Sequence, residues 1–260
     1  MLRRSQPVAR AAARLAVPAL LELGGESASL VLPDVNLDYA AAVAVYSSIV
    51  GLSGQGCAMP TRLLVHDSVD DAMVEKVSAV TAAIKLGDPF DPTVSSRPVG
   101  SEDAQTRVLG MMERAQSEGA GTLLAGGRRP GGDLERGYYV EPTVLGDVDP
   151  ASEIARVEVF GPVLAVPRLG SDDEGLKIAN STGYGLASYL WTSDLRRMQR
   201  ITDVRRAGGV YVNGGCPLAR GLPFGGVGFS GLGREGGREG LYEFARTEAV
   251  AIGRSNSGPS

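Results

Sequence analysis

The stretch that decides the fold is ASLVLPDVNLDYAAAVAVYSSIV at residues 28–50, which joins a short apolar run to a long Ala- and Val-rich segment. A second pair of the same kind follows, with LLVH at 63–66 and VDDAMVEKVSAVTAAIK at 69–85. Each pair predicts a buried strand followed by a helix that is apolar on one face. Strands that alternate with helices at this spacing indicate an α/β fold with a largely parallel sheet.

The same alternation continues on both sides of this stretch. Helices are predicted at residues 37–50, 69–85, 102–118, 172–180 and 195–204, and strands at 19–23, 28–32, 63–66, 122–125, 138–145, 162–169, 186–192, 209–213 and 249–252. The first 21 residues hold four arginines and no acid. They predict a helix over 6–17 that stops at Pro18, and the alternative is an acid-poor transit peptide.

Composition and charge exclude several classes of protein. The 260 residues carry 26 basic and 30 acidic side chains, a net charge of −4, which argues against a dedicated nucleic-acid-binding protein. No apolar run approaches the roughly 18 residues that a membrane span needs, so no membrane association is predicted. Two cysteines and one histidine provide neither a disulfide framework nor a zinc site, so no metal is expected. Acid–base chemistry falls to carboxylates, Lys, Tyr or Cys, because His66 ends a predicted strand before a helix cap.

The glycine-rich stretch at 221–240 contains GVGFSG at 226–231, which matches the dinucleotide fingerprint G-x-G-x-x-G. That fingerprint needs a strand before it and a complete βαβ unit around it, and too little chain follows. We therefore interpret the stretch as turns, or as backbone that approaches a neighbouring site closely.

Two other stretches are candidates for chemistry. LELGG at 21–25 places Glu22 where an apolar strand meets a Gly-Gly turn, and SGQGC at 53–57 presents Cys57 on a glycine-rich turn after a helix. Taken alone, Glu22 is typical of a solvated strand end and Cys57 of a small buried hydrophobe. Cys216 fits the buried interpretation better, although its Gly-Gly-Cys-Pro setting looks exposed.

Taken together, the motifs resemble those of the aldehyde dehydrogenase superfamily, over residues 8–252. They are LELGG (21–25), GQGC (54–57), YVEPT (139–143), EVFGP (158–162), YGLA (184–187), VN (212–213), PFGG (223–226) and SGLGRE (230–235). The resemblance implies the C-terminal half of a member. It implies a remnant of the cofactor-binding domain at 1–25, an α/β catalytic domain at 26–229, and a return segment with a tail at 230–260. The strand at 247–252 would add to a neighbouring subunit's sheet.

The resemblance also implies roles for five residues. Cys57 is the expected nucleophile, which attacks an aldehyde and carries a thioester after hydride leaves for NAD or NADP. Glu22 is the expected base for hydrolysis of that thioester. Glu158, Phe160 and Gly24 are the expected cofactor-binding residues, with Glu158 on the nicotinamide ribose and Phe160 near the nicotinamide ring. The backbone N–H of Cys57 would form half of an oxyanion hole.

Three departures from the family pattern bear on these expectations. The half of a family member that holds most of the dinucleotide-binding sheet is absent from the 260 residues. Glu26 stands where the family usually has lysine, and a like charge there is expected to raise the pKa of Glu22. Gly56 gives the turn before Cys57 extra freedom.

The expected function is therefore NAD(P)-dependent oxidation of a small-molecule aldehyde by a truncated family member. The chain is expected to form a homo-oligomer, or to need its missing N-terminal half. A cytoplasmic location follows from the reduced thiol that the chemistry requires. The alternatives are a non-catalytic fragment that associates with other subunits and a cofactor-independent thiol esterase.

Overall fold

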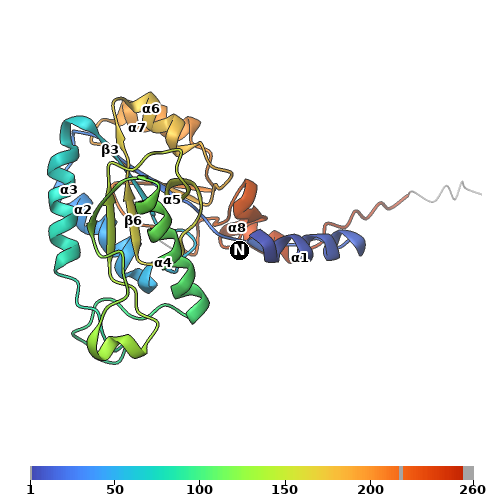
Figure 1. The fold of residues 1–260 in the computed structure, drawn as a ribbon. Coiled ribbons are helices and arrows are strands. Elements are labelled where there is room, and N and C mark those ends of the chain that lie inside the picture. The colour runs from blue at the N-terminus through green and yellow to red at the C-terminus, as the bar shows by residue number, and fades with distance from the viewer. Residues whose placement is uncertain (1, 217–218, 254–260) are drawn as a thin grey trace, which may run out of the picture.

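A mixed, mostly parallel sheet forms the centre of the protein (Figure 1). The computed structural model describes residues 2–216 and 219–253. The strand order is β4-β5-β6-β3-β2-β8-β9, β7 also pairs with β3, and only the β4–β5 pair among these is antiparallel. The predicted α/β fold with a largely parallel sheet is therefore confirmed. The strands are β2 (Ala28–Val31), β3 (Arg62–His66), β4 (Thr122–Ala125), β5 (Thr143–Gly146), β6 (Val163–Val166), β7 (Arg168–Leu169), β8 (Ala187–Trp191) and β9 (Gly209–Val212).

Helices cover both faces of this sheet (Figure 1). On one face, α2 (Leu37–Val45) and α3 (Asp67–Ala82) pack against Leu63 and Val65. On the other face, α6 (Asp172–Ala179) and α7 (Leu195–Val204) pack against Leu30 and Leu64, and α4 (Glu102–Ser117) packs against Leu145. Successive strand residues point to opposite faces, so the continuous apolar runs supply both cores.

Polar caps start the helices where the sequence changes from strand to helix. The Asn36 side chain accepts a hydrogen bond from the Tyr39 backbone N–H at 3.0 Å, and Ser101 and Ser171 cap α4 and α6 in the same way. His66 ends β3, and its Nδ1 accepts from the Ser68 backbone N–H at 3.3 Å. The chain's one histidine thus ends a strand, as the sequence predicts, and itself caps α3, where the sequence placed the cap at Asp67-Ser68.

One helical stretch corrects the expectation that no segment reaches membrane-spanning length. Leu37–Gly54 comprises α2, the π-helical turn η1 (Tyr46–Val50) and the 3-10 turn η2 (Gly51–Gly54), and is long and apolar enough to span by length and composition. Its apolar residues Ala40, Val45 and Ile49 are fully buried in the core beside α3. The stretch is therefore a core element of the α/β body, and its apolar composition is explained by that packing.

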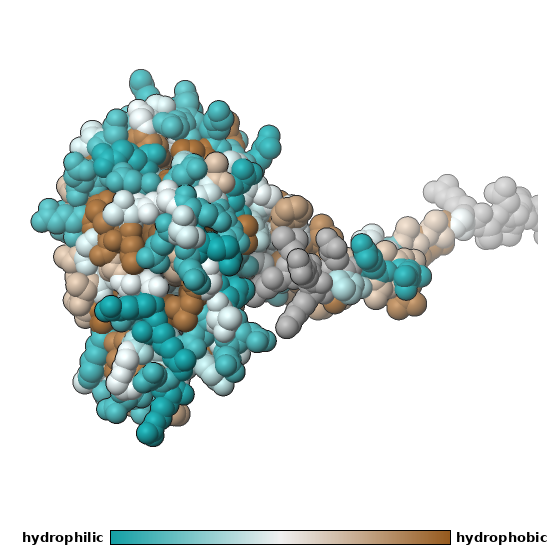
Figure 2. Space-filling model, in the orientation of Figure 1, coloured by the Kyte–Doolittle hydropathy of each residue, from teal (hydrophilic) through white to brown (hydrophobic). Residues whose placement is uncertain are grey.

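The N-terminal segment leaves the body and returns to it. The helix α1 (Leu2–Arg14) projects away from the sheet, with its end three residues before the predicted one (Figures 1 and 2). The chain then returns as β1 (Leu21–Glu22), which pairs antiparallel with β10 (Gly231–Leu232) in a separate two-stranded sheet. Residues from the two ends of the chain therefore meet beside the α/β body.

The C-terminal part differs from the predictions in two places. The glycine-rich stretch contains η4 (Gly228–Ser230), β10 and the short helix α8 (Gly237–Glu243), none of which its sequence pattern signals. The predicted strand at 249–252 forms no strand, and the side chains of Val250 and Ile252 are 79% and 92% exposed. A strand requires a hydrogen-bonding neighbour, and no described strand lies beside this segment. The remaining elements are η3 (Gly132–Arg136) and α5 (Glu153–Arg156).

Candidate active site

The loop that carries Cys57 has a strained backbone before the cysteine. Leu52 and Ser53 adopt left-handed φ values of 47° and 53°, and Gly54 has φ of 72°. A Cβ at Gly54 would lie 2.0 Å from the Gly161 carbonyl oxygen, so only glycine fits this crossing. The Ser53 hydroxyl accepts a hydrogen bond from the Arg97 backbone N–H at 3.0 Å. The turn is therefore held by its surroundings in one conformation.

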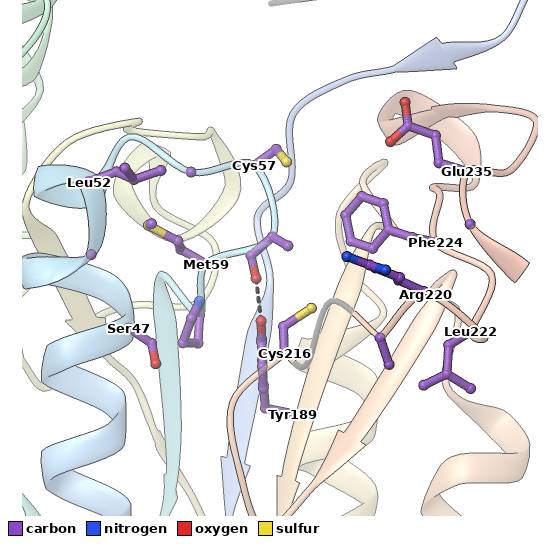
Figure 3. Close-up of a pocket in the computed structure, with 16 residues that line it drawn as sticks. Ser47, Leu52, Cys57, Met59, Tyr189, Cys216, Arg220, Leu222, Phe224 and Glu235 are labelled. Carbon is purple, nitrogen blue, oxygen red and sulfur yellow. Dashed lines mark hydrogen bonds between the residues drawn. The ribbon is translucent and has the colours of Figure 1, made fainter.

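Cys57 faces a cavity of about 610 Å³ (Figure 3). The wall is mostly apolar, and Figure 3 shows both thiols of the chain directed toward it. Cys216, for which the sequence favoured a buried position, instead lies half-exposed in this wall. The wall also includes Ser47, Leu52, Met59, Tyr189, Arg220, Leu222, Phe224 and Glu235.

The surroundings of the Cys57 thiol favour its neutral, protonated form over the thiolate. Burial raises its pKa above the usual value, and the negative charge of Glu22 raises it further. The backbone N–H groups of Cys57 and Ala58 act in the opposite direction by hydrogen bonding. Those two amides are thus the groups in the turn that favour the reactive thiolate.

Glu22 is a carboxylate without a hydrogen-bonding partner. It lies on β1 opposite Gly231, and among the described residues nothing donates to either buried oxygen. Burial raises its pKa to about 7, the nearby charge of Glu235 raises it as well, and Arg234 lowers it. A carboxyl group with such a pKa can exchange protons near neutrality, as a general base must.

Glu26 does not act on Glu22 as the sequence suggested. Its side chain is buried, and there the Thr61 hydroxyl donates to Oε1 at 3.0 Å and the Arg62 Nε lies 3.9 Å from Oε1. Burial raises the pKa of Glu26 to about 8. The like charge that raises the pKa of Glu22 is Glu235, because pairing of β1 with β10 brings the C-terminal segment beside it.

The expected cofactor-binding residues come from two distant segments. The Gly25 backbone N–H donates to Glu158 Oε1 at 3.0 Å, and a Cβ at Gly24 would lie 2.0 Å from Glu158 Oε2. Gly24 and Glu158 therefore touch, and a side chain at position 24 would displace this carboxylate from its present place. Phe160 is half-buried with a left-handed φ of 51°, and Arg107 Nη2 donates to its carbonyl oxygen at 3.3 Å. Within residues 2–216 and 219–253, no group of three or more His, Cys, Asp or Glu side chains could hold a metal ion.

Sequence reasoning missed several residues of this site. Glu235 and Arg234 lie within the SGLGRE motif, which signalled their importance but not their electrostatic effect on Glu22. Tyr189 on β8 and Arg220 in the cavity wall had no signal, because nothing local relates them to Cys57. Their place depends on the order of the strands in the sheet.

The fold and this site define an α/β protein with a cysteine at a largely apolar cavity and a carboxylate near enough to act on the pKa of that cysteine. The model of the aldehyde dehydrogenase family matches residues 4–250, so the chain belongs to that family. The resemblance drawn from its motifs is thereby confirmed.

Several characterised proteins are similar over nearly the whole chain. A chloroplastic betaine aldehyde dehydrogenase of Beta vulgaris is 38% identical over 96% of this chain and 49% of its own length. A peroxisomal aminoaldehyde dehydrogenase of Pisum sativum is 41% identical over 92% and 47%. The NAD⁺ complex of a Mycobacterium tuberculosis aldehyde dehydrogenase superposes with a TM-score of 0.93 at 37% identity, over 99% of this chain and 52% of that one. The chain spans about half the length of the relatives it matches.

Proposed function

We propose that the chain supplies the nucleophile and the base for NAD(P)-dependent oxidation of an aldehyde to a carboxylic acid. The observation that carries this proposal is the Glu22 carboxylate, which is buried, lacks a hydrogen-bonding partner among the described residues and has a pKa raised to about 7. It lies close enough to Cys57 for its charge to raise the pKa of the thiol. A cysteine and a nearby carboxylate whose pKa values are both raised suit acyl chemistry through a thioester.

The steps assigned to the chain's residues follow from this geometry. The Cys57 thiolate attacks the aldehyde carbon and forms a C–S bond, and the backbone N–H of Cys57 stabilises the resulting oxyanion. A bound NAD or NADP would accept the hydride that converts this adduct to a thioester. Glu22 then takes a proton from water as the oxygen attacks the thioester carbon, and the thiolate leaves with the acid released.

The residues near Glu158 fit a nicotinamide cofactor. Glu158 Oε1 accepts from the Gly25 N–H, while Oε2 packs against Gly24 and has no hydrogen-bond donor among the described residues. A carboxylate held in this way can accept a hydrogen bond from a ribose hydroxyl through its second oxygen. We assign Glu158 and Gly24 to the ribose, and Phe160 to the nicotinamide ring. Solved relatives hold NAD⁺, which favours the same class of cofactor here.

The wider context of this activity is proposed on the same basis. Relatives named for betaine aldehyde and aminoaldehydes, and a Pseudomonas syringae relative solved with octanal, favour a small-molecule aldehyde as substrate. We propose a homo-oligomer in which residues 247–252 pair with a second chain, since Val250 and Ile252 are exposed. We keep the division at 1–25, 26–229 and 230–260, and a cytoplasmic location that keeps Cys57 reduced.

The test is formation of reduced cofactor by the purified chain. NAD or NADP is supplied with a panel of aldehydes, and Cys57→Ala is measured in parallel. Because the chain spans about half the length of its relatives, turnover is expected only when the other half of a family member is supplied as well, and that turnover should disappear in Cys57→Ala. Turnover that persists in Cys57→Ala would refute the assignment of the nucleophile.

A second candidate is a cofactor-independent thiol esterase. It is favoured because this chain itself supplies both Cys57 and Glu22, the two groups that acylation and deacylation require. Cys57-dependent hydrolysis of an ester without reduction of NAD or NADP would favour it. Absence of both activities, with binding to intact family subunits, would favour a non-catalytic fragment.

A further inference from the structure

Tyr189 joins the central sheet to the turn that carries Cys57. It lies on β8, is 3% exposed, and its hydroxyl donates a hydrogen bond to the Ala58 carbonyl oxygen (Figure 3). Its ring packs against Tyr211 with centroids 5.5 Å apart. Burial raises its pKa well above the usual range, so the hydroxyl keeps its proton and remains a donor. The residue after the nucleophile is therefore tied to a buried strand by a side chain.

The turn has few other constraints on its exposed side. Gly56 precedes Cys57, and the turn closes with a 3.4 Å hydrogen bond from the Met59 backbone N–H to the Gly56 carbonyl, which is long. On the opposite side, a Cβ at Gly25 would lie 2.4 Å from the Cys57 carbonyl oxygen, so backbone packs directly on backbone there. Gly56 leaves the backbone before Cys57 flexible, and the Tyr189 hydroxyl is the side-chain group that holds the backbone after it, at Ala58.

The orientation of this turn decides how the thiolate is stabilised. The backbone N–H groups of Cys57 and Ala58 lower the pKa of the thiol, and burial and Glu22 raise it. The Ala58 carbonyl lies in the peptide plane next to the one that carries the Ala58 N–H, so holding this carbonyl limits rotation of the backbone that carries both amides. If the turn rotates, those N–H groups move away from the sulfur while burial and the charge of Glu22 stay in place.

We propose that Tyr189 is a positioning residue, whose hydrogen bond to the Ala58 carbonyl keeps the two amides directed at Cys57 Sγ. It acts through the turn and touches no reacting atom. The inference deepens the proposed function, because it names a residue on which the reactivity of the nucleophile depends. It concerns the thiol itself, and so can be tested without an aldehyde, an ester or a cofactor.

Tyr211 offers a matched control. It lies beside Tyr189 on the neighbouring strand β9, but its hydroxyl hydrogen-bonds with Cys216. Tyr189→Phe and Tyr211→Phe each remove one hydroxyl from the same pair of rings. Only the first breaks a bond to the Cys57 turn.

The experiment measures alkylation of Cys57 by iodoacetamide as a function of pH, with Cys216→Ser as the background. Tyr189→Phe is expected to move the pH profile to higher pH and to lower the rate near pH 8 about three- to tenfold, which corresponds to a pKa rise of about half to one unit. Tyr211→Phe is expected to leave both unchanged. A merely structural role would lower the melting temperature without moving the profile.

An unmoved profile in a folded Tyr189→Phe variant would overturn the proposal, as would equal shifts in the two variants. If Tyr189→Phe does not fold, 3-fluorotyrosine at position 189 keeps the size and strengthens the donor. It is then expected to move the profile to lower pH, whereas the same substitution at position 211 has no effect. Equal profiles for the two fluorinated chains would again overturn the role of Tyr189. Failure of dehydrogenation alone would bear on the proposed function and leave this result intact.

Discussion

Replacement of Glu22 by glutamine tests the base directly, because glutamine keeps the shape and removes the proton-accepting group. A chromogenic acetate ester acylates Cys57 and releases its alcohol in a first burst, and later release reports hydrolysis of the thioester. We expect Glu22→Gln to keep the burst and to slow the later phase about 10²- to 10⁴-fold, the usual contribution of a general base. Rapid-mixing absorbance measurements separate the two phases.

The pH dependence gives a sharper magnitude. With a pKa of about 7, Glu22 is ionised in about 9% of molecules at pH 6 and about 91% at pH 8, so deacylation should rise about tenfold between them. A carboxyl group at its ordinary value of 4.5 would be ionised throughout this range, and the rate would be nearly flat. Glu235→Gln removes the like charge that raises the pKa of Glu22, so its profile should move to lower pH.

Two results would refute this reasoning. A deacylation rate that is flat from pH 6 to pH 8 would mean that burial does not hold the proton on Glu22. A later phase of equal rate in Glu22→Gln would mean that water is activated by another group. The size of the burst serves as the control, since it reports Cys57 and should be the same in both proteins.

Three further predictions follow from the geometry. Gly54→Ala should lower the free energy of unfolding by about 1–3 kcal/mol more than Gly119→Ala. Both glycines have positive φ, but only the added methyl group at position 54 would meet a neighbouring backbone. Equal urea midpoints for the two variants would contradict this. The pKa of Glu26 is raised from 4.5 to about 8 in the folded chain, so the folded state binds its proton more tightly than the unfolded state does. The stability that this provides is complete below about pH 4.5 and is lost as the pH rises through about 8. Glu26→Gln should therefore gain stability relative to the natural chain between pH 6 and pH 9 in urea titrations, and parallel curves would show otherwise. The guanidinium of Arg220 lies in the cavity wall and should attract anionic reagents toward Cys57. In a chain that carries Cys216→Ser, Arg220→Gln should lower the ratio of Cys57 modification by anionic to that by cationic methanethiosulfonates about two- to fivefold. An unchanged ratio would count against a charge effect.

The regular elements could be predicted because their signal is local. The predicted strands at 63–66 and 122–125 match β3 and β4 closely, since an apolar run bounded by polar residues needs no knowledge of its neighbours. The helix α8 and the strand β10 were missed because glycine-rich sequence carries no apolar period. The strand at 249–252 was predicted from composition, but pairing is a non-local property and the described chain offers it no partner.

The site was predictable in part for the same reason. Motifs pointed to Cys57 and Glu22 one at a time, through resemblance to a family. The electrostatic effect of Glu235 on Glu22 joins residues more than two hundred positions apart, and it depends on the pairing of β1 with β10. The bond from Tyr189 to the Ala58 carbonyl likewise depends on which strand lies beside the turn. Sequence could supply the chemistry of the groups but not the distances that set their pKa values.

Glycine gives this site its close crossings of distant segments. A Cβ at Gly25 would lie 2.4 Å from the Cys57 carbonyl oxygen, and one at Gly54 would lie 2.0 Å from that of Gly161. At both crossings the obstacle is backbone, which cannot move aside as the end of a flexible side chain can. Main-chain contacts therefore support Cys57 from the side of Gly25, beside the Tyr189 hydrogen bond to the Ala58 carbonyl, and a methyl group at Gly25 would displace the nucleophile. The close packing of backbone on backbone at this site requires glycine at these crossings, and the same packing fixes the place of the Cys57 thiol.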